Sequence, residues 1–312
     1  MAKRLSLLGL LAALVASPAL ATHYDVYLLA GQSNMDGRGS VQDLKGDLAP
    51  YAGERPGVLL WYSNGTIRHL QGHSAGWVPL QPGFAVPPGI RPTDGATTQP
   101  APGGQGKVEL QLPFRYFGPE VGFAKAMHDA EPDRQFALIK FTVGGSNLKR
   151  EWNPQRKLLY EQFVTAARAA LQALTARGDT YTVCGFLWHQ GESDATVPEA
   201  DYEKLLGELL NDVRKEFKDP NLPIVLGEPF DNGKRISIRI AQRNLAKKME
   251  NVYCVSSVGL KTADRETHFN AASQVEIGRR FAEAILKKQD AGPVPTTPTT
   301  APSSTQPSVE EP

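Results

Sequence analysis

Five short apolar runs, each separated from the next by a longer amphipathic segment, constrain the fold of this chain more than any other feature. We expect strands at 25–30, 136–143, 181–188, 224–227 and 252–258. We expect helices at about 118–130, 153–178, 198–217, 236–249 and 271–288. Asn153 and Pro154 suit the N-cap and first helical position of the second helix. Strands alternating with helices are typical of βαβ units, so the sequence predicts an α/β fold around a mainly parallel sheet.

The segment 37–112 breaks this alternation. It is rich in Gly and Pro and holds only short apolar runs, such as Val58 to Tyr62. Within it, 81–106 is expected to be a long surface insertion. Loops of that length are often functional or mobile. A rim or lid over a substrate cleft and a plain variable loop both remain open.

The two ends have compositions unlike the middle. Lys3 and Arg4 precede an apolar run over 5–15 and a small-residue site ending at Ala21, so residues 1–21 are expected to be a signal peptide. The apolar run is short for a membrane span, although an uncleaved anchor is the alternative. Residues 291–312 are rich in Pro and Thr and are expected to form a disordered tail. This leaves one domain at 22–290 and predicts a secreted or periplasmic protein.

Charge and cysteine content limit the partners. The formal net charge of +1 becomes −1 once the two basic residues of the signal are removed, so no basic field attracts nucleic acid. Cys184 and Cys254 lie in separate apolar runs and are expected to be buried thiols, since a disulfide would need neighbouring strands. His69 and His73 lie in a Gly-rich stretch, which argues against a metal site. We expect no metal, cofactor or nucleic acid, and the sequence does not indicate an oligomeric state.

The first expected strand runs directly into a turn that carries Ser33. Open α/β sheets bind their ligands at the carboxyl ends of the strands, and backbone N–H groups there can stabilise an oxyanion. Ser33 is therefore a candidate nucleophile, although an isolated Gly-x-Ser turn is a weak signal.

Three further polar clusters follow expected strands and should share the same sheet edge, at 143–147, 188–195 and 264–270. In the first, paired glycines allow close backbone approach. In the second, Gln190 can offer a side-chain N–H to an oxyanion, and Glu192 or Asp194 can orient its neighbours. Strand alternation points His189 away from Gln190, so we assign His189 a structural role.

The third cluster contains Asp264 and His268, which gives the chain order Ser, Asp, His. In a serine hydrolase the imidazole removes the hydroxyl proton of the nucleophile, and a carboxylate holds the imidazole in the required tautomer. Together with Ser33 these residues form a candidate triad.

Taken together these blocks resemble the SGNH hydrolases, in the branch that contains carbohydrate esterase family six and the sialic acid-specific acetylesterase domain. The matching motifs are Gly31-Gln-Ser-Asn-Met35, Gly118-Pro-Glu120, Gly144-Gly-Ser-Asn147, Trp188-His-Gln-Gly-Glu192, His268-Phe-Asn270 and Gly278-Arg-Arg280. The resemblance implies a flavodoxin-like three-layer α/β/α sandwich and cofactor-free removal of acetyl groups from sugars. It implies that Ser33 is the nucleophile and His268 the general base. It also implies an oxyanion hole formed by the N–H groups of Ser33 and Gly145 and by the side chain of Gln190.

One position departs from the family pattern. The family commonly places its acidic residue three positions before the histidine, where this chain has Arg265. A one-residue bulge in the loop would restore Asp264, and Glu266 or Glu192 could serve instead. Asn147 is a further possible supporting residue.

The resulting prediction is a serine esterase that removes acetyl groups from carbohydrates, of the acetyl xylan or sialate type, through an acetyl-serine intermediate. A general short-chain carboxylesterase is the alternative within the same class. A carbohydrate-binding protein on a degenerate hydrolase scaffold is the alternative from another class. A structural cell-envelope protein has only the Pro/Thr-rich tail in its favour.

Overall fold

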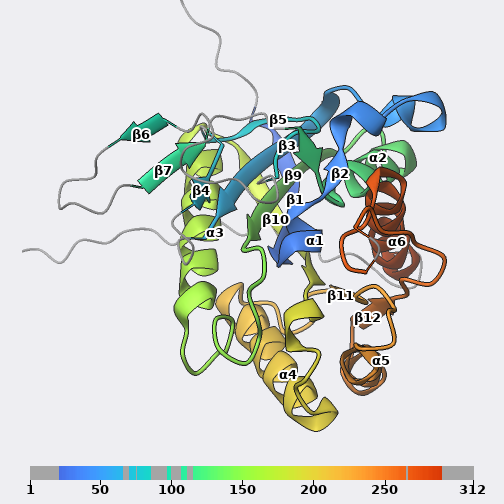
Figure 1. The fold of residues 1–312 in the computed structure, drawn as a ribbon. Coiled ribbons are helices and arrows are strands. Elements are labelled where there is room, and N and C mark those ends of the chain that lie inside the picture. The colour runs from blue at the N-terminus through green and yellow to red at the C-terminus, as the bar shows by residue number, and fades with distance from the viewer. Residues whose placement is uncertain are drawn as a thin grey trace, which may run out of the picture.

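A seven-stranded sheet forms the centre of the molecule (Figure 1). The computed structural model describes residues 21–65, 70–74, 76–85, 97–99, 107–110, 115–264 and 266–289. The strands are β1 (His23–Gly31), β3 (Arg55–Asn64), β5 (Val78–Leu80), β9 (Gln135–Thr142), β10 (Thr180–His189), β11 (Ile224–Gly227) and β12 (Val252–Val255). Their order is β12-β11-β10-β1-β9-β3-β5, and only β5 runs antiparallel to its neighbour.

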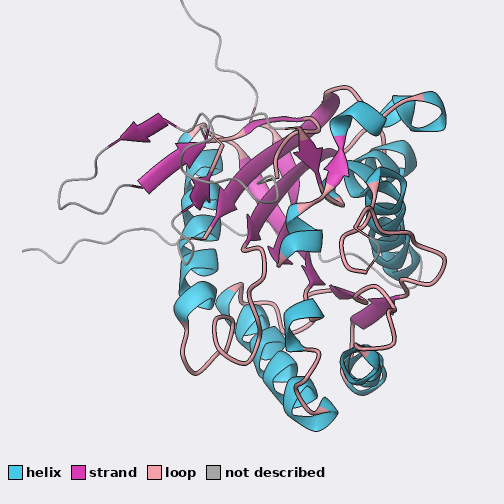
Figure 2. Cartoon of the chain, viewed as in Figure 1, coloured by secondary structure: helices cyan, strands magenta, loops and turns pink. Residues whose placement is uncertain are grey.

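Helices cover both faces of this sheet (Figure 2). One face carries α3 (Leu158–Ala176), α4 (Glu199–Glu216) and α5 (Ile236–Lys248), and the other carries α2 (Glu120–Ala130) and α6 (Ala271–Gln289). Along β1, Val26 and Leu28 pack in the core beneath α3, α4 and α5, whereas Tyr27 and Leu29 pack in the core beneath α2 and α6. Successive side chains of a strand point to opposite faces, so β1 is apolar throughout because it is covered twice. The expected α/β/α sandwich is confirmed.

The second helical layer depends on two glycines. A Cβ built on Gly122 of α2 would lie 2.1 Å from the carbonyl oxygen of Val275, and one built on Gly278 of α6 would lie 2.1 Å from that of Pro119. Neither position has room for a side chain, because the two helix backbones approach each other so closely.

Several short elements lie outside the main sheet and its covering helices. They are α1 (Ser33–Asp36), the pair β2 (Gly39–Ser40) and β8 (Tyr116–Phe117), the 3₁₀ turns η1 (Val41–Asp43), η2 (Gly46–Tyr51) and η4 (Glu192–Asp194), and a small sheet of β4 (Leu70–Gly72), β6 (Thr97–Gln99) and β7 (Lys107–Leu110). Of the expected insertion at 81–106, the structure describes 81–85 and 97–99. Residues 1–20 of the expected signal peptide and the expected tail at 291–312 lie outside the described residues.

One strand was not predicted, and one expected helix start was wrong. The apolar run from Val58 to Tyr62, which was not among the expected strands, is part of β3 in the main sheet. Helix α3 begins at Leu158 and not at Pro154. The side chain of Asn153 accepts a hydrogen bond from the N–H of Gln155 in a separate turn, and a left-handed residue at 157 follows that turn before the helix starts.

Cys184 and Cys254 are both free thiols. They lie on β10 and β12, which are separated by β11, so they do not face each other across neighbouring strands. The expectation that both are buried was wrong in degree, because each residue is only partly buried. Burial still raises the pKa of the Cys254 thiol to about 12. Among the helices of the described part of the chain, none is long and apolar enough to span a membrane.

The strand order points to one edge of the sheet as the place where a ligand would be expected. Strand β1 lies at the centre, with β9 on one side and β10 on the other, and the chain adds strands on both sides of it. In open α/β sheets the crevice lies outside the carboxyl end of the strand where the order reverses. Ser33 follows the carboxyl end of β1 directly.

Candidate active site

The turn after β1 places Ser33 at the start of α1, two residues after a close contact of Gly31 with β10. Gly31 has φ of +150°, and a Cβ built on it would lie 2.1 Å from the carbonyl oxygen of His189. Only glycine fits there. The turn is closed by the N–H of Gly37, which donates to the carbonyl of Ser33 at 2.8 Å.

Asp264 and His268 lie at the tip of a tight loop between β12 and α6. The N–H of Ala263 donates to the carbonyl of His268 at 2.8 Å, which closes the loop. His268 Nδ1 lies 2.5 Å from Asp264 Oδ2, and His268 Nε2 lies 3.0 Å from Ser33 Oγ. The structure therefore brings the three predicted residues into one chain of hydrogen bonds, with the geometry of a nucleophile, base and orienting acid.

Asp264 lies four positions before His268 and still reaches it, because the loop folds back over the carboxylate. Asp264 Oδ1 accepts hydrogen bonds from the N–H groups of Thr267 and His268, both at 2.9 Å. Burial by itself raises the pKa of Asp264, but these N–H groups and the imidazole outweigh it and lower the pKa. Asp264 is therefore held ionised, the state that stabilises a protonated His268.

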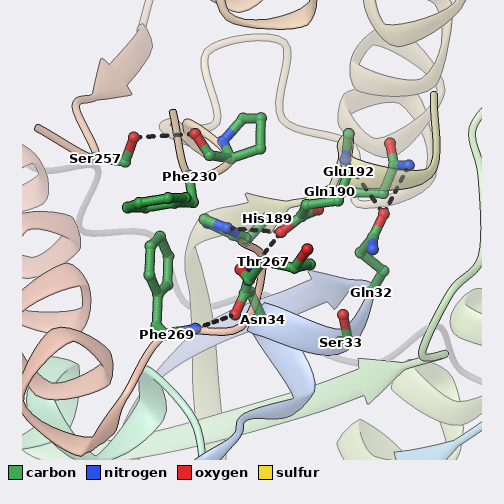
Figure 3. Close-up of polar contacts among 12 residues, drawn as sticks. Gln32, Ser33, Asn34, His189, Gln190, Glu192, Phe230, Ser257, Thr267 and Phe269 are labelled. Carbon is green, nitrogen blue, oxygen red and sulfur yellow. Dashed lines mark hydrogen bonds and ion pairs between the residues drawn. The ribbon is translucent and has the colours of Figure 1, made fainter. Parts of the chain in front are cut away.

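Asn34 fastens this loop to the nucleophile turn (Figure 3). Its Nδ2 donates to the carbonyl of Thr267 at 2.9 Å, and its Oδ1 accepts from the N–H of Phe269 at 3.0 Å. Both bonds flank His268 in the chain. Because Asn34 is the neighbour of Ser33, it fixes Ser33 and His268 relative to each other.

Glu192 supports Asn34 and does not contact His268 in the described structure. Its Oε1 accepts from Asn34 Nδ2 at 2.5 Å and lies 3.5 Å from His189 Nε2. Burial raises the pKa of Glu192, but His189 and Asn34 outweigh it and lower the pKa to about 2. The ring of His189 packs edge-on against Phe269 behind the site, as the predicted structural role requires.

Glu266, the other alternative acid, points away from the imidazole. Its carboxylate lies 3.2 Å from Lys234 Nζ, and its side chain is 63% exposed. The carbonyl of Glu266 and the hydroxyl of Thr267 accept from the guanidinium of Arg235, at 3.0 and 2.9 Å. Arg235 thus holds the same loop through contacts of its own.

The side chain of Gln190 makes its contacts inside the protein, and its expected oxyanion role stays a prediction. It is fully buried, and its Nε2 donates to Asp194 Oδ2 at 2.5 Å and to the carbonyl of Ser146 at 3.3 Å. Its two amide protons are therefore directed at acceptors inside the protein. Gly145 has a left-handed φ of +69° in the turn after β9, where that conformation favours glycine.

Asp194 ties the turn after β9 to the turn after β10. Its Oδ2 accepts from the N–H of Leu148 at 2.7 Å. Burial raises the pKa of Asp194. Asn147 stabilises its own turn, since its Oδ1 accepts from the N–H of Arg150 at 2.8 Å. Both residues shape the turn, and neither contacts Ser33 or His268 in the described structure.

A buried ionic cluster below Ser33 was not predicted. Lys140 of β9 is fully buried and donates to the carbonyl of Asp36 at 2.5 Å, to that of Phe84 at 2.8 Å and to Glu120 Oε2 at 2.8 Å. Burial raises the pKa of Glu120, against the effect of Lys140. A lysine in the middle of an apolar strand was the available signal, because a buried ammonium needs a partner.

Comparisons with known proteins identify the family of this chain. Residues 23–287 match the family described as carbohydrate esterase, sialic acid-specific acetylesterase. The chain belongs to this family. Within the described residues, no group of three or more His, Cys, Asp or Glu side chains is placed to hold a metal ion.

Relatives of known structure share the fold of the family. A probable carbohydrate esterase of Arabidopsis thaliana is 30% identical over 173 residues, which span 54% of this chain and 63% of that protein. Its crystal structure superposes with a TM-score of 0.60 at 24% identity, over 84% of this chain and 98% of that one. NanS superposes with a TM-score of 0.62 at 17% identity, over 89% and 100%. A carbohydrate acetylesterase from Xanthomonas citri superposes with a TM-score of 0.56 at 18% identity, over 86% and 57%.

Proposed function

We propose that this member of the family is a serine esterase that hydrolyses acetyl esters of carbohydrates. The observation that supports it most directly is the hydrogen-bonded series Asp264, His268 and Ser33 at the carboxyl edge of the sheet. Membership of a carbohydrate esterase family supports the substrate class.

The reaction follows from these contacts. Ser33 Oγ attacks the acetyl carbonyl carbon while His268 Nε2 takes the hydroxyl proton, and Asp264 stabilises the imidazolium. The carbon–oxygen bond to the sugar breaks as the imidazolium returns its proton to the sugar oxygen. Water then attacks the acetyl-serine with His268 again as base, which releases acetate and regenerates Ser33 Oγ. The N–H groups of Ser33 and Gly145 are the proposed oxyanion donors.

Loss of the nucleophile tests this proposal. The protein should release acetate from p-nitrophenyl acetate and from acetylated xylan, and Ser33→Ala should reduce turnover by up to ~10⁶-fold if the triad acts as a unit. A serine-directed fluorophosphonate should add one adduct to the wild type and none to Ser33→Ala, read by intact-protein mass spectrometry. Hydrolysis that survives in Ser33→Ala would refute the serine mechanism. Glycan binding without adduct or hydrolysis would favour the carbohydrate-binding alternative.

We also propose that the protein is exported, because residues 1–21 have the basic, apolar and small-residue order of a signal peptide. N-terminal sequencing of protein recovered from the periplasm or medium should begin at Thr22. Full-length protein retained in the membrane fraction would instead indicate an anchor.

A further inference from the structure

Arg38 lies beside the nucleophile, and the reaction described above does not use it. A Cβ built on Gly144 would lie 3.1 Å from Arg38 Nη2 and 3.9 Å from Ser33 Cβ. The guanidinium and the nucleophile therefore border the same small space, beside the turn after β9. An ester that reaches Ser33 Oγ brings its sugar into these surroundings.

The contacts of Arg38 leave a single nitrogen for a ligand. Nη1 donates to Asp36 Oδ2 at 2.7 Å and to the carbonyl of Gly37 at 2.5 Å. Nε is buried and has no hydrogen-bond partner in the described structure. Nη2 is the nitrogen that faces Gly144, and it donates to no acceptor among the described residues. The side chain as a whole is only 10% exposed, so its orientation is fixed by packing.

This arrangement selects the kind of group that Arg38 can bind. A carboxylate is normally held by two parallel N–H donors of a guanidinium. Here Asp36 already occupies the Nη1 side and compensates the charge, and the Nε side is closed by burial. One nitrogen cannot form the paired contact with a carboxylate that two nitrogens form, and with its charge compensated it suits a neutral oxygen, such as a hydroxyl, a ring oxygen or the ester oxygen of a sugar.

We propose that Arg38 is a substrate-binding residue that donates one hydrogen bond from Nη2 to a neutral oxygen of the acetylated sugar. The substrate class that follows is a neutral sugar ester, as in acetylated xylan, and not an ester of a sialic or uronic acid. This inference rests on the proposed esterase function and specifies its substrate.

The conservative variant Arg38→Lys tests the contact, because a lysine keeps a positive charge for the buried carboxylate of Asp36 while it removes Nη2. We expect kcat/KM for acetylated xylooligosaccharides to fall about 10- to 100-fold, mainly through KM, and kcat/KM for p-nitrophenyl acetate to stay within about threefold. Arg134→Lys is the matched control, since Arg134 pairs with Asp25 near the start of β1 at 2.6 Å and should change neither substrate. The wild type should prefer acetylated xylooligosaccharides to O-acetylated sialic acid.

Three results would overturn the inference. Equal losses on both substrates would make Arg38 a positioning residue for the nucleophile turn, and no loss on either would exclude a contact. A higher kcat/KM for O-acetylated sialic acid would contradict the neutral class. Binding separates this inference from the esterase proposal: in the Ser33→Ala background, Arg38→Lys should weaken calorimetric binding of acetylated xylooligosaccharides at least ~10-fold. An unchanged Kd there would refute it even if the wild type hydrolyses nothing.

Discussion

Replacing Asp264 by asparagine separates two tasks that this side chain performs at once. Its Oδ1 accepts from the N–H groups of Thr267 and His268, and its Oδ2 faces His268 Nδ1 at 2.5 Å. An asparagine retains Oδ1 and so keeps the loop closed. It places an amide N–H against Nδ1, which then has to accept, so the imidazole proton moves to Nε2. In that tautomer His268 cannot take the proton of Ser33.

The expected loss of kcat depends on how far Asp264 and His268 are exposed to solvent. In a buried triad the change of tautomer reduces kcat by ~10⁴-fold. Here the Asp264 side chain is 42% exposed and that of His268 is 29% exposed, so water competes for Nδ1 and screens the charge. We therefore expect a smaller loss in kcat, ~10²- to 10³-fold at neutral pH, with little change in KM because the interaction acts in the transition state.

The assay is steady-state hydrolysis of p-nitrophenyl acetate by Asp264→Asn, with thermal unfolding measured on the same samples. Glu266→Gln is the matched control, because Glu266 lies two residues away on the same loop and pairs with Lys234 at 3.2 Å. Its activity should stay within about twofold, as expected for an exposed pair. The reasoning fails if Asp264→Asn keeps more than about a third of wild-type kcat, or if Glu266→Gln is equally impaired while both proteins remain folded.

Three further changes test the surroundings of the site. Lys140→Met should lower the free energy of unfolding in urea by ~3–5 kcal/mol, because it leaves the buried carboxylate of Glu120 unpaired. The double variant Lys140→Met, Glu120→Gln should recover part of this loss. A double variant that recovers none of it would contradict the pairing. Gly278→Ala should lower the free energy of unfolding by ~1–3 kcal/mol or more, because the added Cβ would lie 2.1 Å from the carbonyl oxygen of Pro119. Gly207→Ala is the control and should not lower it, because the nearest atom to its added Cβ is in a side chain at 3.3 Å. Glu192 has a folded-state pKa of about 2 and an unfolded value near ~4.3, so its stabilisation is present above pH ~4.3 and is lost as the pH falls towards 2. Glu192→Gln should flatten the dependence of the unfolding midpoint on pH in that window, and an unchanged slope would show that Glu192 does not titrate there.

The sheet could be predicted where its strands were buried on both faces. The runs that became β1, β9 and β10 are apolar and of strand length, and amphipathic helices separate them. Strand β3 was missed because it alternates between buried and partly exposed positions within a Gly- and Pro-rich segment. The start of α3 was misplaced because Asn153 and Pro154 fit a helix start equally well as a turn, and only the left-handed residue at 157 distinguishes the two.

At the site, Ser33, Asp264 and His268 could be predicted from their places after strand ends, whereas the contacts that hold them in position could not. Ser33 and His268 follow β1 and β12, so the topology alone brings them to one edge. The bonds of Asn34 join positions more than 200 residues apart, and no local pattern encodes such a contact. Gln190 also follows a strand end, but the direction of its side chain depends on a hydrogen bond to Asp194. The spacing of residues in the sequence does not predict that bond.

The loop between β12 and α6 directs Asp264 at His268 even though the acid lies four positions before the histidine. With three residues between Asp264 and His268, the carboxylate reaches back over the turn and caps the N–H groups of Thr267 and His268. That cap fixes one carboxylate oxygen and leaves the other directed at the imidazole. The backbone of the loop thereby orients its own acid, and Asn34 and Arg235 both hold the loop. A loop held in this way can orient His268 without a buried acid from another element, which is why an Asp264 that is partly exposed to solvent can serve the triad.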